Sequence, residues 1–259
     1  MNSTVTYEKM NGLGIVSINH PPLNVLSQQV FQELKNAFLQ LKEDEEIVAV
    51  LVTGAGNRAF VAGADIKEFP QLIGNRDMKE SVMEGHRVLT EIQQFPKPTI
   101  AVLNGLTLGG GCELALSCDM RIAEEHAQIG LPEITLGLFP GAGGTQRLPR
   151  LVGAAKAKEL MYTGEAISAK EAERIGLVNS VVETGKGVEA GIALAKKMTR
   201  HSLQVLSRIK QAVDHGLDTT LENGIEIEAN LLVEVFQTED IKEGVSAFIE
   251  KRKPVFRHR

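Results

Sequence analysis

The stretch that decides the fold is PTIAVLNG at residues 98–105, followed directly by LTLGGGCELALSCD at residues 106–119. The first part is a short apolar run with several branched side chains, which favours a strand buried on both faces. The second part passes through a cluster of glycines into ELALS, which favours the start of a helix. We therefore expect a strand, a glycine turn and a helix in that order.

The same order recurs on both sides of this stretch. IVAVLVTGAG at residues 47–56 is an apolar strand that runs into glycines, and MRIAEEHAQIGLPE at residues 120–133 suggests a third unit. GLVNSVVE at residues 176–183 indicates a late strand, after a helix that begins with the capping box Ser168-x-x-Glu171. Apolar strands that alternate only weakly are typical of parallel sheets covered by helices. The predicted fold class is therefore α/β.

The N-terminal region predicts a hairpin and then a helix. VTYEKMNGLGIVSIN at residues 5–19 indicates two short strands around an Asn11-Gly12 turn. Ser27 can cap a following helix. Apolar residues recur on one face of that helix, at Val30, Leu34, Phe38 and Leu41. We expect this face to cover the sheet.

The C-terminal part of the chain has a different character, because beyond about residue 190 only helical patterns remain. One apolar stripe contains Leu221, Ile225, Ala229, Leu232 and Phe236, and a second contains Ile241, Val245, Phe248 and Ile249. We therefore predict a core domain at residues 1–195 and a helical subdomain at residues 196–259. Since such helices cannot bury both faces alone, they are expected to pack on the core or on another subunit.

Composition excludes several classes of protein. The 259 residues carry a net charge of −5, which argues against nucleic acid as the main partner. The polar N-terminus does not resemble a signal peptide, and no stretch approaches the roughly 20 apolar residues of a spanning helix, so we expect a soluble intracellular protein without membrane contact. Cys112 and Cys118 form neither a disulfide framework nor a zinc spacing, so we interpret them as reduced thiols and predict no metal site.

Three segments are dense in glycine: AFVAGADIKEF at 59–69, NGLTLGGGCEL at 104–114 and LPEITLGLFPGAGGTQR at 131–147. Glycine lets a ligand approach the backbone, and N–H groups at a helix start attract anions, so these segments are suited to binding an oxyanion. A nucleotide loop is the first alternative, but neither GxGxxG after a strand nor GxxxxGK[ST] occurs. The other alternative, glycines that serve only turns and packing, explains poorly why all three segments lie next to an acid.

Two acids stand out within these segments. Glu113 follows three glycines and begins an apolar helix, where its carboxylate would sit at a buried helix start beside exposed N–H groups, and Glu133 lies in the apolar turn LPEITLG. Two carboxylates close together among apolar residues would titrate as a coupled pair, with at least one protonated near neutral pH. General acid–base catalysis needs such a pair. The alternative is that both acids only stabilise helix N-termini.

The glycine segments resemble the signature segments of the enoyl-CoA hydratase, or crotonase, family. The resemblance is carried by GADIKE at 63–68, NGLTLGGGCELALSCD at 104–119 and LPEITLGLFPGAGGTQRLPR at 131–150. PPLNVLS near the start, TGEAISAKEAERIGLVN at 163–179 and GVSAFIEKRKPVF at the end extend it over essentially the whole chain. It implies a crotonase-type spiral of ββα units followed by a C-terminal helical region that makes trimer contacts.

The resemblance also implies roles for individual residues. Ala64 and Gly110 match the two oxyanion-hole residues of the family, whose N–H groups bind the thioester oxygen, and Glu113 and Glu133 match its two catalytic acids. Substrate contacts are expected at Val25, Ala62, Asp65, Ile66, Lys67, Gly109, Gly141 and Lys251. Among these, Gly141 corresponds to a backbone position near the catalytic water. Val25 replaces an alanine common in the family, which leaves the preferred acyl length open.

The implied activity is that of a hydro-lyase acting on short or medium trans-2-enoyl-CoA in fatty-acid metabolism. Water activated by Glu113 would add at C3 and Glu133 would deliver a proton to C2, with no cofactor beyond the CoA of the substrate. Isomerases of the family usually keep only the acid at the position of Glu133, so hydration is favoured. An isomerase or another enolate-forming enzyme, and a non-catalytic acyl-CoA binding protein, remain the alternatives. A cytoplasmic homohexamer of two trimers is expected.

Overall fold

Two β-sheets form the centre of the computed structural model, which describes residues 3–259; the first two residues of the predicted core lie outside this range. The larger sheet has the strand order β1-β2-β3-β5-β7-β10. Its strands are β1 (Val5–Met10), β2 (Leu13–Ile18), β3 (Ala49–Gly54), β5 (Thr99–Leu103), β7 (Met120–Glu124) and β10 (Ser180–Val182). The predicted hairpin of β1 and β2 is confirmed as an antiparallel pair, and the other neighbours are parallel.

The smaller sheet has the order β4-β6-β8-β9. It consists of β4 (Ala59–Ala62), β6 (Leu106–Leu108), β8 (Gln128–Gly130) and β9 (Ile167–Ser168). The first three strands are mutually parallel, and β9 runs antiparallel to β8. The carboxyl ends of three parallel strands therefore lie side by side at one edge of this sheet.

The chain crosses from the larger to the smaller sheet three times and enters helical structure after each crossing. β3 and β4 lead to the 3-10 turn η1 (Ile66–Glu68) and α2 (Lys79–Gln93), and β5 and β6 lead to α3 (Gly110–Leu116). β7 and β8 lead to the 3-10 turn η2 (Pro132–Leu136) and α4 (Gly144–Val152). This repetition confirms the predicted spiral of ββα units and the α/β class.

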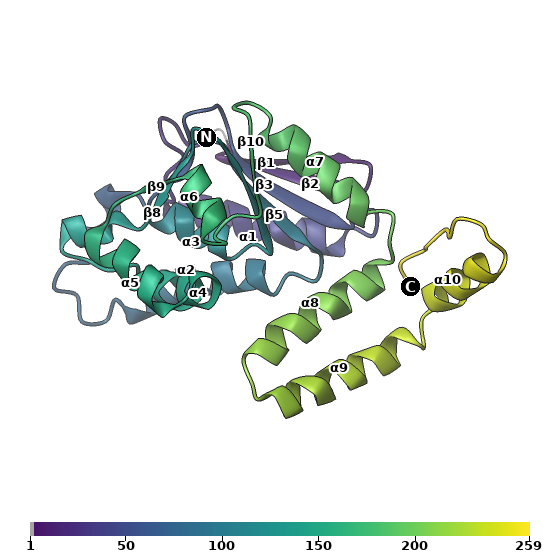
Figure 1. The fold of residues 1–259 in the computed structure, drawn as a ribbon. Helices are drawn as coiled ribbons and strands as arrows, with labels where there is room; N and C mark the ends of the chain where they lie inside the picture. The colour runs from purple at the N-terminus through teal and green to yellow at the C-terminus, as the bar shows by residue number, and fades with distance from the viewer. Residues whose placement is uncertain (1–2) are drawn as a thin grey trace.

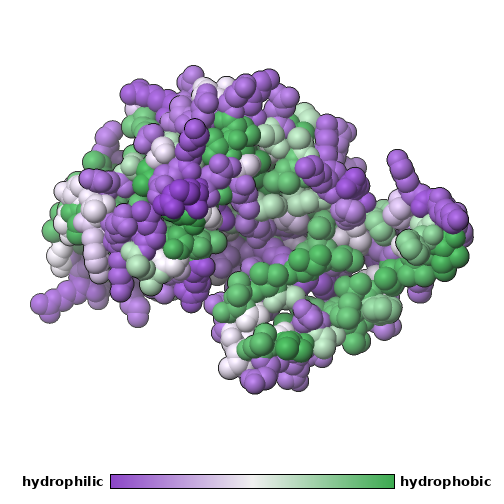
Figure 2. Space-filling view, in the orientation of Figure 1, coloured by the Kyte–Doolittle hydropathy of each residue, from purple (hydrophilic) through white to green (hydrophobic). Residues whose placement is uncertain are grey.

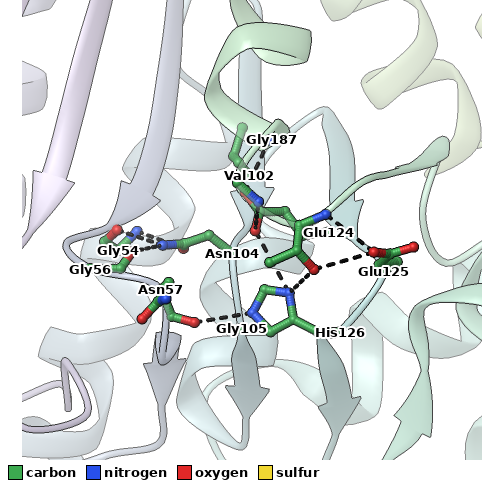
Figure 3. A network of polar contacts seen from close by, with 12 residues as sticks. Gly54, Gly56, Asn57, Val102, Asn104, Gly105, Glu124, Glu125, His126 and Gly187 are labelled. Carbon is green, nitrogen blue, oxygen red and sulfur yellow. Dashed lines mark hydrogen bonds and ion pairs between the residues drawn. The ribbon is translucent and has the colours of Figure 1, made fainter.

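A polar network ties the three crossings together (Figure 3). The buried Asn104 side chain, in the second crossing, donates hydrogen bonds of 2.7 Å to the carbonyls of Gly54 and Gly56 in the first. In the third crossing, Nε2 of His126 lies 3.0 Å from the carbonyl oxygen of Asn57. Because these hydrogen bonds join segments that are far apart in the sequence, they help to fix the relative positions of the loops between the sheets.

Helices cover both faces of the larger sheet. Ser27 caps α1 (Gln28–Glu43), as predicted, and the apolar face of this helix is buried at Val30, Leu34, Phe38 and Leu41. On the other face, α7 (Gly187–Met198) packs against β3, β5 and β7. The remaining core helices are α5 (Ala154–Thr163) and α6 (Ala169–Arg174), and α6 has the predicted cap, in which Ser168 accepts the Glu171 N–H.

The chain ends in a C-terminal helical region, as predicted. α8 (Leu203–Leu217) and α9 (Leu221–Val235) form a hairpin that extends away from the sheets, and α10 (Glu239–Ile249) lies beyond its open end (Figure 1). An ion pair of 2.9 Å between Lys210 and Asp119 connects α8 to the core. The boundary predicted after residue 195 falls in the last turn of α7.

The apolar stripes of the C-terminal helices are not covered by the core. Exposed members are Leu221, Ile225, Leu232, Phe236, Val245, Phe248 and Ile249, and Phe248 leaves 85% of its surface exposed. Figure 2 shows hydrophobic side chains gathered over α8, α9 and α10. These stripes were expected to pack on the core or on another subunit. Since the core leaves them exposed in the single chain, packing on another subunit remains. No helix within residues 3–259 has the length and apolarity required to cross a membrane.

Candidate active site

The candidate site forms where β4, β6 and β8 end. Ala62 of β4 pairs with Leu108 of β6, and Leu108 in turn pairs with Gly130 of β8. Two or three residues beyond these paired positions, the chain reaches Ala64, Gly110 and Glu133. Parallel register therefore brings together three residues that are far apart in the sequence, at the edge of a sheet where ligand sites are common.

The backbone of Ala64 is oriented by Leu26. Leu26 N–H donates to the Gly63 carbonyl at 2.9 Å, and its carbonyl accepts the Asp65 N–H at 2.8 Å, which makes a parallel bridge between Leu26 and Ala64. In such a bridge the bonds come from the residues that flank Ala64, so the Ala64 N–H points to the opposite side. Among residues 3–259 no acceptor binds this N–H.

Gly110 supplies the second amide. It is the first residue of α3, and within the described chain its N–H has no acceptor either, as expected for the first turn of a helix. A methyl group built on Gly110 would lie 3.6 Å from the Ala64 nitrogen and 3.3 Å from Cδ1 of Leu26. The two amides therefore border the same small space, in which they could bind one oxyanion.

Glu113 lies in the first turn of α3 and is only 2% exposed. Its Oε1 accepts hydrogen bonds from the N–H groups of Ala142 at 2.7 Å and Gly144 at 2.8 Å. Burial raises the pKa of Glu113, and the Gly144 and Ala142 hydrogen bonds partly oppose this rise. Within residues 3–259 no donor reaches Oε2. One oxygen is thus held by the protein and the other is available to a water or substrate.

The source of these N–H groups differs from the sequence-based interpretation. We expected Glu113 to lie beside the N–H groups of its own helix start, but the donors belong to the start of α4. The left-handed Gly143, at φ +106°, separates the two donor residues and makes their N–H groups converge. The PGAGG glycines form an anion-binding turn, as expected for a glycine-dense segment, but the anion that they bind is a side chain of the protein.

Glu133 lies in η2 and has a different environment. A methyl group built on Gly109 would come within 3.0 Å of its Oε1, and its Oε2 is buried without a hydrogen-bond partner among the described residues. Burial, together with the nearby charge of Glu113, raises the pKa of Glu133 to about 7. An orphaned buried oxygen is unfavourable for a carboxylate, so this environment favours the protonated form.

The other residues predicted from the resemblance lie in two places. Seven of them lie on or next to the strand ends and helical turns just described: Val25, Ala62, Asp65, Ile66, Lys67, Gly109 and Gly141. Asp65 accepts the Lys67 N–H and so caps η1, while Ile66 and Lys67 are exposed. Lys251 follows α10, which lies apart from α3 and α4 (Figure 1). The single chain therefore does not bring Lys251 to the site.

The two cysteines differ from reactive thiols. Both are buried, and burial raises the pKa of Cys118 to about 12 and the pKa of Cys112 also upward. A thiol held in its neutral form is a poor nucleophile, so neither cysteine is expected to attack a substrate. No group of three or more His, Cys, Asp or Glu residues in the range 3–259 is arranged to hold a metal ion.

Within residues 3–259, two amides without an acceptor and two carboxylates that influence each other electrostatically lie near the ends of β4, β6 and β8. This arrangement is suited to enzymes that stabilise an oxyanion while protons move on neighbouring atoms. The chain belongs to the enoyl-CoA hydratase/isomerase family, whose model matches residues 8–259. The resemblance predicted from sequence is thereby confirmed, as is the crotonase-type fold.

Individual relatives agree over nearly the whole chain. The short-chain-enoyl-CoA hydratase of Clostridium acetobutylicum is 41% identical over 97% of this chain and 96% of that protein. The crotonyl-CoA hydratase of Syntrophomonas wolfei is 41% identical over 97% of each chain. The crystal structure of an enoyl-CoA hydratase from Bacillus anthracis is 39% identical, with a TM-score of 0.93 over 99% of this chain and 100% of that one.

Proposed function

We propose that this protein is an enoyl-CoA hydratase, a hydro-lyase that adds water to a trans-2-enoyl-CoA to give a 3-hydroxyacyl-CoA. The observation that carries the proposal is the contrast between its two carboxylates. Glu113 Oε1 accepts two backbone hydrogen bonds, which favours a charged base, and Glu133 Oε2 is buried without a donor, which favours a neutral acid. Hydration requires one group of each kind.

The mechanism follows from these two states. The N–H groups of Ala64 and Gly110 bind the thioester oxygen and draw electron density from C3 of the enoyl group. Glu113 accepts a proton from water as the water oxygen bonds to C3. The C2–C3 π electrons then form an enolate whose negative oxygen the two amides stabilise, and Glu133 protonates C2. Each turnover leaves Glu113 protonated and Glu133 ionised, and proton exchange with solvent restores both. Overall, water supplies the hydrogen and the hydroxyl group, so the reaction is redox-neutral and needs no cofactor beyond the CoA of the substrate.

Two other functions remain to be tested. A Δ3,Δ2-enoyl-CoA isomerase or another enolate-forming enzyme would move a proton without adding water, for which the acid at position 133 would suffice; the held carboxylate of Glu113 favours hydration. A non-catalytic acyl-CoA binding protein would bind the thioester without turnover. It predicts equal product formation, at background level, for the wild type and for Glu113→Gln combined with Glu133→Gln.

Purified protein and crotonyl-CoA provide the decisive assay. Hydration removes the conjugated double bond, so absorbance of the enoyl thioester should fall and 3-hydroxybutyryl-CoA should appear by mass spectrometry. Conversion of a 3-enoyl-CoA to its 2-enoyl isomer without gain of water would instead identify an isomerase. Unchanged absorbance with crotonyl-CoA and with longer enoyl thioesters would contradict the proposed hydratase.

The remaining expectations are proposals of the same kind. We propose substrate contacts at the seven residues that border the site and at Lys251, and a division into a core at residues 1–195 and a helical subdomain at 196–259. We also propose a cytoplasmic homohexamer of two trimers that acts in fatty-acid metabolism. The exposed apolar stripes of α9 and α10 support contacts between subunits. The acyl length can be determined by comparing kcat/KM over a series of enoyl-CoA substrates.

A further inference from the structure

Arg147, on α4, is a partly buried cation beside the candidate site that the proposed mechanism does not use. Its Nη1 donates a hydrogen bond of 3.0 Å to the carbonyl of Ala142. Its Nε donates a second bond, of 2.8 Å, to the side chain of Gln93 on α2. A guanidinium held on both sides in this way has a fixed plane.

The carbonyl that Arg147 binds lies between the two backbone N–H groups that hold Glu113. The N–H groups that hold Glu113 Oε1 belong to the peptide units before Ala142 and before Gly144. The carbonyl bound by Arg147 belongs to the unit between them. Arg147 therefore fixes the middle peptide, and the flanking donors are fixed with it.

Gly143 shows how closely the guanidinium follows this turn. A methyl group built on Gly143 would overlap Nη1 of Arg147. The same residue has φ +106°, which only glycine adopts readily. Arg147 thus lies directly against the turn that makes the two donors converge on Glu113.

We propose that Arg147, held by Gln93, is a positioning residue for Glu113: it fixes the Ala142–Gly144 turn whose N–H groups orient the carboxylate, and it places a positive charge near that carboxylate. The inference rests on the proposed function for its kinetic consequences, but not for the state of Glu113 itself. Arg147 acts through the turn rather than on the substrate.

Several ionisable groups affect Glu113 besides Arg147. The carboxyl of Glu133 approaches from η2, the imidazole of His86 from α2, and the thiol of Cys112 adjoins it in α3. The charges of His86 and Arg147 both lower the pKa of Glu113. A pH experiment on Arg147 therefore needs His86→Gln as a parallel variant.

The kinetic experiment compares Arg147→Met, Arg147→Lys and Arg150→Met in hydration of crotonyl-CoA. Loss of positioning in Arg147→Met should lower kcat about 10- to 100-fold with little change in KM. The acid limb of its pH–rate profile should move to higher pH, because a base that has lost its neighbouring cation holds its proton more tightly. Arg147→Lys keeps the charge, so its acid limb should stay in place while kcat recovers only in part.

Arg150→Met is the matched control, because Arg150 lies on the same helix and is exposed, and its contacts are to Gln146 and Asp218 rather than to the Glu113 turn. It should retain wild-type kcat. A kcat for Arg147→Met within twofold of the wild type, or equal losses in both methionine variants, would overturn the proposal. If Arg147→Met fails to fold, Gln93→Leu tests the same arrangement and should lower kcat less, without moving the acid limb.

A measurement without turnover separates this inference from the proposed function. The Glu113 carboxyl can be titrated by ¹³C NMR in the full chain, as wild type, Arg147→Met and His86→Gln. The titration of Glu113 should move to higher pH in Arg147→Met whether or not crotonyl-CoA is hydrated. An unchanged titration would refute the role of Arg147 even in an active hydratase, whereas a shifted titration in a protein that does not hydrate enoyl-CoA would refute only the proposed function.

Discussion

Glu113 lies close enough to Glu133 for its charge to raise the pKa of Glu133, yet Oε1 of Glu113 accepts two backbone hydrogen bonds while Oε2 of Glu133 is buried without a partner among the described residues. The difference arises from the elements that carry them. α3 directs Glu113 toward the N-terminus of α4, where N–H groups are free, whereas η2 directs Glu133 over Gly109, which offers no donor to Oε2. Burial raises the pKa of both carboxyls, but the two hydrogen bonds favour the charged form of Glu113 and the unpaired oxygen favours the neutral form of Glu133. The proposed general base and general acid need this contrast.

The first prediction concerns these two carboxylates separately. Glu113→Gln and Glu133→Gln keep the size of the side chain but cannot exchange a proton in the required way. Each should lower kcat for hydration by about 10²- to 10⁴-fold. Because the two groups act in one reaction, the double variant should lose much less than the product of the two losses. Steady-state assays test this, and a single variant with near-normal kcat would contradict the assigned role.

The second prediction concerns stability and pH. The folded pKa of Glu133 lies at about 7, above its ordinary value of 4.5, so the buried carboxyl favours the folded state least when it is ionised. The contribution of Glu133 to the free energy of unfolding is fully present below about pH 4.5 and is lost as the pH rises through 7. Glu133→Gln cannot ionise, so its melting temperature should rise relative to that of the wild type between pH 4.5 and 8. A difference that is constant over this range would show that Glu133 is not held protonated.

The third prediction tests the amide of Gly110. Proline is tolerated at the first position of a helix, so Gly110→Pro should remove the N–H donor while leaving α3 in place. Loss of one oxyanion donor should lower kcat about 10²- to 10³-fold. Gly110→Ala is the comparison: it keeps the N–H but adds a methyl group 3.3 Å from Leu26 and 3.6 Å from the Ala64 nitrogen, so it should lose less activity than Gly110→Pro, not none. Equal activities of the two variants would mean that the Gly110 amide does not bind the substrate oxygen.

Local sequence patterns predicted much of the fold because they reflect local physics. The Asn11-Gly12 turn, the Ser27 cap and the Ser168 cap each depend on residues within a few positions of one another, and all three are present. In the predicted capping box, however, the Glu171 carboxylate binds Arg174. The strand–glycine–helix units followed from apolar runs that are buried on both sides. The residues expected at the site came from the family resemblance, and strand register is what brings Ala64, Gly110 and Glu133 together.

The remaining features depend on contacts between distant segments. Nothing in the residues near Glu113 shows that its partners are Ala142 and Gly144, 29 and 31 positions away. The bridge from Leu26 that turns the Ala64 N–H outward is equally non-local. A glycine-rich turn that opens a helix signals an anion site, but only the fold shows which anion occupies it.

The fourth prediction concerns Gly109. A side chain there would meet Oε1 of Glu133 at 3.0 Å, and φ +53° adds a backbone penalty for any residue other than glycine. Gly109→Ala should therefore displace Glu133 and lower kcat. Gly176→Ala is the matched control, because Gly176 also has a positive φ, +79°, but a methyl group there would meet nothing within 4 Å. Activity lost equally in both variants would indicate general strain rather than displacement of Glu133.

The fifth prediction concerns assembly. The apolar stripe on α9 remains exposed in the single chain, and large exposed apolar surfaces mark interfaces between proteins. If this stripe joins subunits, Ile225→Asp should place a charge in the interface and shift the protein from a hexamer toward smaller species in sedimentation velocity. Leu39→Asp is the control, because Leu39 on α1 is 53% exposed, close to the 56% of Ile225, but lies outside the C-terminal helices. It should leave assembly unchanged. A wild-type protein that sediments as a 28.1 kDa monomer would contradict the proposed hexamer, and an intact hexamer in Ile225→Asp would place the subunit contacts elsewhere.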